Sequence, residues 1–254
     1  MEQPRVYGVK SFEHAFDRLE DRCDEVLNFV PVFDERFIRD NDDWSTKLYP
    51  ELSGFLRAAA NDQPGLRLAL DAHTTLAFAA GSVLNIKSGR AVELEQRTIA
   101  RNVWAADDVP ANPDWPTLDQ TVLKINSDAP DVAVALGITH DIADDVRRYT
   151  ETQLPTVGRL LILRPSTGTG SQVVAAGRHA FDFAQSAKEA MRSANHGVSP
   201  GSVTHLFVAA PNALTFFLGQ QAPVLGCVRL FEFDFEGGRD RSYRPSLTLP
   251  VRSG

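Results

Sequence analysis

Residues 205–220 read HLFVAAPNALTFFLGQ. The apolar run His205–Ala209 is followed by Pro211 and then by the short apolar segment Ala213–Leu218, a pattern that predicts a buried strand turning directly into a helix. Residues 67–82, RLALDAHTTLAFAAGS, show the same pattern. At a constant offset of 138, the earlier stretch shares five identities with the later one: Leu68 with Leu206, Ala72 with Ala210, Leu76 with Leu214, Phe78 with Phe216 and Gly81 with Gly219. The repeat predicts two related α/β halves whose strand-to-helix turns face a common crevice.

After residue 130 the chain alternates between strand-like and helix-like patterns. Strands are predicted at Asp131–Ile138, Arg159–Leu163, His205–Ala209 and Val228–Phe235. Helices are predicted at Ile142–Leu154, His179–Ala194 and Ala213–Leu218. This alternation is typical of βαβ units that form a mainly parallel sheet covered on both faces. Because right-handed crossovers dominate, the strand-to-helix turns should all lie along one edge of the sheet.

The first 130 residues are less regular. Apolar residues at three- and four-residue spacing predict an amphipathic helix over Phe12–Val26. Further elements are predicted as strands at Leu27–Phe33, Leu66–Leu70 and Ala91–Arg97, and as helices over residues 49–59 and over Thr74–Ala80, the last ended by Gly81. Residues 104–130 hold four prolines and many polar residues. We therefore expect a helical segment over 1–28, a first half over 29–104, a Pro-rich connection over 105–130 and a second half over 131–254.

The composition is that of an ordinary globular protein, with 43% hydrophobic and 23% charged residues. No run of about eighteen apolar residues occurs, and the N-terminal residues MEQPRVYGVKSFEH lack the apolar core of a signal peptide, so we expect a cytoplasmic protein without a membrane span. The net charge of −7 argues against a binder of long nucleic acids, although a small anionic ligand needs only a local set of donors. We interpret the two widely spaced cysteines, Cys23 and Cys227, as structural.

Two loops that follow predicted strands are candidates for ligand contact. The loop RPSTGTGSQ, residues 164–172, offers hydroxyls and closely approachable backbone for a phosphate or ribose at Ser166, Thr167, Gly168, Thr169 and Gly170. It matches neither a P-loop nor a GxGxxG fingerprint, and a flexible connection is the alternative. In the loop after residue 138, Thr139 or Asp141 could cap a helix while His140 reaches a ligand; the alternative is a helix cap with a surface histidine.

Other candidates come from charge, aromatic character and position at the repeated turns. Arg36 and Lys87 could supply positive charge from the first half, since a guanidinium pairs with phosphate in bidentate fashion. Trp104 and Tyr243 could stack on bases, although such residues more often belong to a core. The two repeated turns contribute His73, Pro211 and Asn212, the last at a helix start that could hold a phosphate.

The sequence gives no positive reason to expect an enzyme, a metal site or a cofactor. The one GxSxG match, GVSPG at residues 197–201, follows a predicted helix and precedes a predicted strand, so it is not the strand-to-helix turn of a nucleophile elbow. The sequence contains no HExxH motif and no recognisable pairing of cysteine with histidine. His140 and Asp141 are only an adjacent pair, whereas a metal site would need three converging ligands.

Three segments together resemble the SAVED family, the domain that is SMODS-associated and fused to various effectors. They are HLFVAAPNALTFFLGQQAPVLGCVRLFEFDF followed by YRPSLTLP, LALDAHTTLAFAAGSVLNIKSG, and GRHAFDFAQSAKEA. The resemblance spans residues 28–250 and is most specific in the C-terminal block. It implies two fused, CARF-like Rossmann-type halves that sense a cyclic oligonucleotide in bacterial anti-phage systems of the CBASS or type III CRISPR kind.

The resemblance also implies a ligand and partners. A cyclic trinucleotide such as cyclic tri-adenylate is the expected ligand, and its binding is expected to drive self-association or to activate an effector. We recognise no effector segment in the sequence, so we expect either a stand-alone sensor that signals to a separate effector protein or the sensor part of a longer chain. The alternatives are a ring nuclease, in which His140 or Lys87 would assist attack by a ribose hydroxyl, and an interaction subunit whose pocket has decayed.

Overall fold

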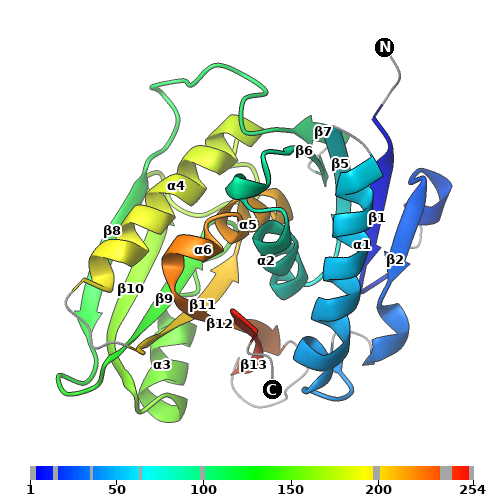
Figure 1. Cartoon of the computed structure of the whole chain (residues 1–254). Coiled ribbons are helices and arrows are strands. Elements are labelled where there is room, and N and C mark those ends of the chain that lie inside the picture. The colour runs from blue at the N-terminus through cyan, green and yellow to red at the C-terminus, as the bar shows by residue number, and fades with distance from the viewer. Residues whose placement is uncertain are drawn as a thin grey trace.

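The computed structural model describes residues 4–13, 17–34, 37–62, 65–97, 101–196, 201–234 and 242–251. These residues form two α/β units, each built around its own sheet, with helices packed between the sheets (Figure 1). The strand order is β2-β1-β5-β6-β7 in the first sheet and β13-β12-β11-β9-β10-β8 in the second. The central strands of both sheets run parallel. The predicted α/β class, with two halves and mainly parallel sheets, is therefore confirmed.

The first sheet ends in an antiparallel edge strand, β7. Its strands are β1 (Val6–Lys10), β2 (Glu25–Asn28), β5 (Gly65–Asp71), β6 (Ala91–Arg97) and β7 (Arg101–Trp104). The π-helical turn η3 (Trp44–Leu48) leads into helix α1 (Tyr49–Asp62), and α2 (Thr74–Val83) connects β5 to β6. Leu52 and Leu56 of α1 are fully buried because their four-residue spacing places them on one face of the helix. The short elements of this half are η1 (Leu19–Asp21), η2 (Val30–Val32), β3 (Phe33–Asp34), β4 (Phe37–Ile38) and η4 (Ile86–Ser88).

The second sheet is covered on both faces. Its strands are β8 (Leu118–Lys124), β9 (Asp131–Gly137), β10 (Val157–Pro165), β11 (Val203–Ala209), β12 (Cys227–Asp234) and β13 (Ser242–Leu249), and its helices are α3 (Ala143–Gln153), α4 (Gly177–Ala194), α5 (Asn212–Gly219) and α6 (Ala222–Leu225). Every residue of β9 is buried. Ala133 and Ala135 belong to the apolar cluster of α3, whereas Val132 and Val134 belong to the core that contains α4. This double coverage explains why the strand is continuously apolar rather than alternating.

Helices α2 and α5, which belong to the two repeated stretches, cross in close contact at the centre of the molecule (Figure 1). A Cβ atom on Gly81 would lie 2.0 Å from the carbonyl oxygen of Phe216, and one on Gly219 would lie 2.1 Å from that of Phe78. The repeat offset of 138 relates Gly81 to Gly219 and Phe78 to Phe216, so each contact is the repeat equivalent of the other. The two halves are therefore related by an approximate two-fold axis through the crossing. The prediction that Gly81 ends its helix is wrong, because α2 continues to Val83 and the glycine permits the close approach.

The N-terminal part of the prediction is also wrong within the described residues, which exclude 14–16. No helix spans Phe12–Val26; the short turn η1 and the strand β2 occur there instead. Leu19, Cys23 and Val26 do converge, but on Gly8 of β1, whose added Cβ would lie 3.1–3.2 Å from atoms of all three. The predicted strand over Leu27–Phe33 is likewise divided between the end of β2, the turn η2 and β3. The helical segment expected over residues 1–28 is thus replaced by strands that pair within the first sheet.

Part of the predicted Pro-rich connection is regular structure. Leu118–Lys124 forms β8, which pairs antiparallel with β10 at the edge of the second sheet. The prolines at 110, 113 and 116 precede this strand and Pro130 follows it, which is why the pairing is not interrupted. The irregular connection therefore ends before Leu118, and the division of the chain into domains otherwise stays a prediction.

Candidate functional site

The loops that follow β9, β10 and β11 lie side by side along one edge of the second sheet. The backbone N–H groups of Ile138 and Thr139 both donate to the carbonyl of Ala209, at 2.8 and 2.9 Å. The N–H of Gly170 donates to the carbonyl of Ile138 at 2.9 Å. The structure thus brings the candidate loops at 139–141 and 166–170 together, beside the turn that contains Pro211.

Polar groups of these loops are largely engaged within the protein. One carboxylate oxygen of Asp141 accepts from the N–H of Ala143 at the start of α3, and the other pairs with Arg164 at 2.9 Å. His140 is exposed, and its Nδ1 lies 3.0 Å from the hydroxyl of Thr139. Asp141 therefore binds the first N–H of α3, as the alternative of a helix cap with a surface histidine predicts, and both His140 and Asp141 are exposed.

In the loop over 166–170, several polar groups already have protein partners. Ser166 exchanges two hydrogen bonds with Thr117, through its own N–H and through its hydroxyl oxygen. The N–H of Gly168 donates to Pro165, and Gly168 has a positive φ of 88° that closes the turn. Ser166, Thr167 and Gly168 are exposed, and Thr169 and Gly170 are half-buried. Phosphate contact at this loop stays a prediction. The backbone N–H groups of Gly168 and Gly170 already donate to carbonyls within the protein, so they are not available to a phosphate in this arrangement.

The two repeated turns are in direct contact with each other, whereas the sequence predicts that they face a common crevice. The side-chain amide of Asn212, at the start of α5, donates to the carbonyls of Leu70 and Ala72 at 3.0 and 2.9 Å. His73, at the start of α2, is 8% exposed. Its Nδ1 lies 2.6 Å from the hydroxyl of Ser11, and its ring stacks on Phe33 at 4.3 Å.

Each of the two central helices is capped by a side chain from the opposite half. The N–H of Thr75 in α2 donates to the Glu232 carboxylate at 2.6 Å, and the N–H of Ala213 in α5 donates to the Gln96 side-chain oxygen at 3.3 Å. We call these two contacts the crossed caps. Thr75 and Ala213 are related by the offset of 138. Glu232 and Gln96 are also equivalent, because the strand registers pair Leu66 with Val92 and Thr204 with Val228.

Three other predicted site residues, Lys87, Trp104 and Tyr243, are either remote from this edge or buried. Lys87 is exposed in η4, beyond the opposite end of α2 from His73. Trp104 is 4% exposed and Tyr243 is 5% exposed. Tyr243 belongs to an aromatic cluster with Tyr149 and Phe207, and this burial raises the pKa of its hydroxyl. Arg36 lies outside the described residues.

A cavity of about 1010 Å³ is in a different place, between the two halves. It is bounded by η3 and the start of α1 from the first half and by α6, β12 and β13 from the second, and Ser82 near the end of α2 also lines it. Hydroxyl groups are the commonest polar feature of its wall: Ser45, Thr46, Tyr49, Ser82, Ser246 and Thr248. We call this space the inter-half cavity. None of the fifteen site residues predicted from the sequence is among the described residues that line it.

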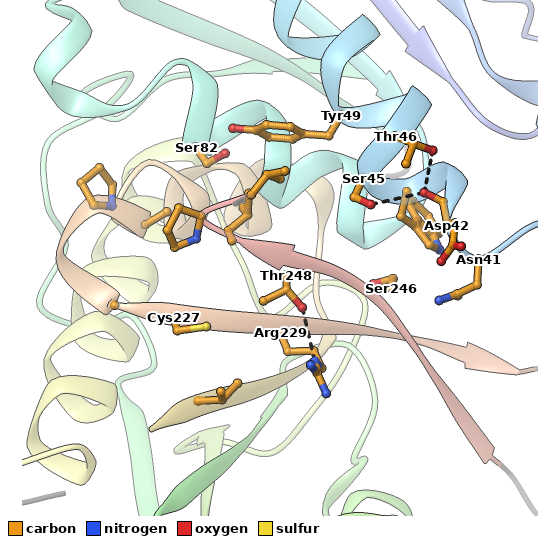
Figure 2. A pocket seen from close by; sticks show the side chains of 18 residues that line it. Asn41, Asp42, Ser45, Thr46, Tyr49, Ser82, Cys227, Arg229, Ser246 and Thr248 are labelled. Carbon is orange, nitrogen blue, oxygen red and sulfur yellow. Dashed lines mark hydrogen bonds between the residues drawn. The ribbon is translucent and has the colours of Figure 1, made fainter. Parts of the chain in front are cut away.

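The close-up in Figure 2 shows how the polar groups are distributed. Tyr49 and Ser82 lie on one side, and Arg229 and Thr248 lie opposite them. The Nε of Arg229 donates to the hydroxyl of Thr248 at 3.3 Å. Among the described lining residues, Arg229 has the only basic side chain. The Asp42 carboxylate also lines the cavity, so the arrangement can offer hydroxyls and one guanidinium to a polar ligand whose anionic group contacts Arg229.

Sequence reasoning missed this cavity because it did not predict β13. The signal was present in the residues SLTL, 246–249, where Ser246 and Thr248 alternate with the buried Leu247 and Leu249. Such alternation is typical of a strand with one polar face. Ser246 and Thr248 therefore both reach the cavity, Leu247 enters the core, and Leu249 belongs to the core and also lines the cavity.

A smaller cavity of about 380 Å³ lies on the other side of the approximate two-fold axis, between β7 and residues 172–176 before α4. Here the connection packs against the start of α4, and the Asp108 carboxylate accepts from the N–H groups of Gly177 and Arg178 at 2.8 and 2.9 Å. The described residues contain no cluster of three or more potential metal ligands. Within the same part of the chain, no helix has the length and apolar character needed to cross a membrane.

Comparison with known proteins identifies the architecture. CD-NTase-associated protein 4 of Enterobacter hormaechei subsp. hoffmannii (strain UCI 50) is 31% identical over 247 residues, which are 96% of this chain and 48% of that protein. The chain thus spans about half the length of this curated relative. The Acinetobacter baumannii Cap4 SAVED/CARF-domain containing receptor with the cyclic trinucleotide 3′3′3′-cAAA superposes with a TM-score of 0.70 at 17% identity, covering 97% of this chain and 51% of that one.

A second solved structure, the Moraxella osloensis Cap4 SAVED/CARF-domain containing receptor, has a TM-score of 0.62 at 18% identity and covers 97% of this chain and 50% of its own. At these identities the two structures show a shared fold. The family model for the SMODS-associated and fused to various effectors sensor domain matches residues 48–249, which include both central helices and β13. The chain therefore belongs to the SAVED family.

Proposed function

We propose that this chain is a sensor that binds a cyclic oligonucleotide, specifically a cyclic trinucleotide of adenylates, in the inter-half cavity. The observation that carries the proposal is a cavity of about 1010 Å³ between the two halves of a SAVED-family chain. Ligand pockets commonly measure about 300–1,000 Å³, so this one is at the upper end and suits a ligand larger than a mononucleotide. The Acinetobacter baumannii receptor with the same fold is described with cyclic trinucleotides.

The wall of the cavity offers the contacts that such a ring needs. The Arg229 guanidinium supplies positive charge for a phosphate. The hydroxyls of Ser45, Thr46 and Ser246 supply hydrogen bonds to phosphate, ribose or base edges. The ring of Tyr49 provides a surface on which a base stacks. With a net charge of −7, the remainder of the protein disfavours long nucleic acids while the cavity admits a compact ring.

A second location for the ring is the edge of the second sheet where the loops after β9, β10 and β11 lie, which we call the loop edge. We propose as the alternative contact set the groups that line it: Thr139, His140, the loop over 166–170 and the start of α5. The alternative of a ring nuclease has no support among the described contacts, because His140 and Lys87 are placed at the loop edge and beyond the far end of α2.

The experiment is a titration with cyclic di-, tri- and tetranucleotides, followed by calorimetry and by melting temperature. Saturation at a hundred times the dissociation constant adds about 2.7 kcal/mol of stability. Arg229→Ala and Tyr49→Ala should weaken binding of cyclic tri-adenylate by tenfold or more, whereas Thr139→Ala and His140→Ala serve as matched controls that leave the affinity unchanged. The reverse pattern would move the site to the loop edge, and no response to any ring would overturn the sensor function.

We further propose that ring binding drives self-association or activates an effector, in bacterial defence against phage. This effector is either a separate protein or a part of the same polypeptide. The proposal is supported by family membership and by the curated relative, which is about twice the length of the aligned segment. Particle mass measured with and without the bound ring tests self-association directly.

A further inference from the structure

The crossed caps are equivalent in position but not in chemistry. On one side the acceptor is the carboxylate of Glu232, at 2.6 Å from the N–H of Thr75, and on the other it is the neutral amide oxygen of Gln96, at 3.3 Å from the N–H of Ala213. Both acceptor residues are half-buried. A carboxylate is favoured at a helix N-terminus by the helix dipole, and hydrogen bonds to a charged acceptor are shorter and stronger. The cap on α2 is therefore the stronger of the two.

Only the cap on α2 is connected to the inter-half cavity. The hydroxyl of Thr75 lies 2.6 Å from that of Ser246, and Ser246 lines the cavity. Thr74 adds a second bond, from its hydroxyl to Glu232 at 3.2 Å. At the equivalent place on α5 the residue is Ala213, which has no hydroxyl. Glu232 thus binds the backbone of Thr75, and the side chain of Thr75 binds Ser246 in the cavity wall.

Thr75, the middle residue of this link, is 1% exposed, whereas Glu232 and Ser246 at its two ends are half-buried. The two hydrogen bonds meet at a buried residue, where the effective dielectric constant is low, so they restrict the position of Ser246 more than a fully exposed contact would. Glu232 itself is not among the cavity-lining residues. Its influence on a ligand would therefore be indirect, through Thr75.

We propose that Glu232 is a positioning residue for the inter-half cavity. It holds the backbone of Thr75 at the start of α2, and the Thr75 hydroxyl in turn holds Ser246 in the cavity wall. The ligand itself rests on the function proposed above. Gln96, the counterpart of Glu232, joins the two halves without influencing the cavity. The approximate symmetry of the fold supplies this residue as an internal control, because it occupies the equivalent position and makes the equivalent backbone contact.

The test compares Glu232→Ala, Glu232→Gln and Gln96→Ala for binding of cyclic tri-adenylate and for melting temperature. E232A should weaken binding about tenfold, and E232Q should retain affinity within about threefold because its amide oxygen still accepts from Thr75. Q96A should lower the melting temperature while leaving the affinity within about twofold of the unmodified protein. Equal losses of affinity in E232A and Q96A, or no loss in E232A, would overturn the proposal.

A double-mutant cycle locates the link. Thr75→Val removes the hydroxyl that meets Ser246 but keeps the capped N–H, so it should weaken binding like E232A. The losses in the double variant should not add, because both changes break the same chain of contacts. Additive losses would show two separate effects and would refute the link.

Hydrogen exchange without any ring separates this proposal from the function it rests on. E232A should accelerate exchange of the amides in residues 242–251, and Q96A should not. If the unmodified protein binds no ring, the proposed function fails, and this exchange pattern alone decides whether Glu232 holds the wall. Unchanged exchange in E232A would overturn the positioning role even if ring binding is observed.

Discussion

Replacing Gly81 by alanine should destabilise the protein strongly, although alanine is the better helix former. In an isolated helix, glycine to alanine gains about 0.8–1.0 kcal/mol. In this fold the added Cβ would lie 2.0 Å from the carbonyl oxygen of Phe216 and 2.8 Å from the backbone nitrogen of Gln220. Because carbon contacts are favourable only beyond about 3.5 Å, α2 and α5 would have to separate by roughly 1.5 Å at their crossing. Overpacking of a core commonly costs about 1–3 kcal/mol, and here both clashing atoms belong to backbone, so we expect a net loss of about 2 kcal/mol or more.

The assay is urea unfolding of Gly81→Ala, Gly219→Ala and their double variant, with Gly54→Ala as the matched control. Gly54 lies on the exposed face of α1, and a Cβ there would meet nothing within 4 Å. G54A should therefore raise the free energy of unfolding by about 0.5–1 kcal/mol. The double variant should lose less than the sum of the single losses, because the first substitution already separates the helices. A G81A protein as stable as G54A would refute the close crossing.

Two further predictions concern the connection and the start of α4. Burial lowers the pKa of His179 below its ordinary value of 6.5, against smaller opposing contributions from the Pro116 carbonyl and Asp182. The unfolded chain therefore binds a proton more readily than the folded one, and the free energy of unfolding should fall as the pH drops below about 6.5, by up to about 1.4 kcal/mol per pH unit. His179→Gln should reduce this slope in urea unfolding at a series of pH values, without abolishing it because burial also lowers the pKa of His205; an unchanged slope would contradict the assignment. Asp108→Ala should lower the free energy of unfolding by about 0.5–2 kcal/mol because it removes the cap of α4. Asp108→Asn should keep most of that stability, since its amide oxygen still accepts a hydrogen bond. Equal losses in D108A and D108N would show that the charge of Asp108, not its capping bonds, stabilises the helix.

The sequence predicted the fold well where all residues of an element share one environment, as in a strand that is buried on both faces. The second half has strands buried on both faces, and the predicted Asp131–Ile138, for example, differs from β9 by one residue. The repeat was predictive because its identities are the contacts themselves: Phe78, Gly81, Phe216 and Gly219 form the helix crossing.

The N-terminal prediction failed for an equally physical reason. The spacing of Leu19, Cys23 and Val26 satisfies a helix, but it is also satisfied by a turn and a strand that pack on Gly8. Periodicity over a short window does not distinguish these arrangements, because the deciding contact is with β1. The inter-half cavity was missed on similar grounds, since its wall combines η3, α6 and β13, which are far apart in the sequence and become neighbours only in the assembled halves.

The duplication also explains why the two sides of the axis differ. Two fused halves need one link, which here runs from the end of β7 to β8 and passes over the start of α4 (Figure 1). There the backbone of Ala105 packs against Gly177, whose added Cβ would lie 2.5 Å from it, and Asp108 caps the helix. On the equivalent side, between β13 and η3, the described residues leave the larger space of about 1010 Å³. The link that fuses the halves thus occupies one of two equivalent grooves, which is why the ligand site proposed above is a single cavity and not a symmetric pair.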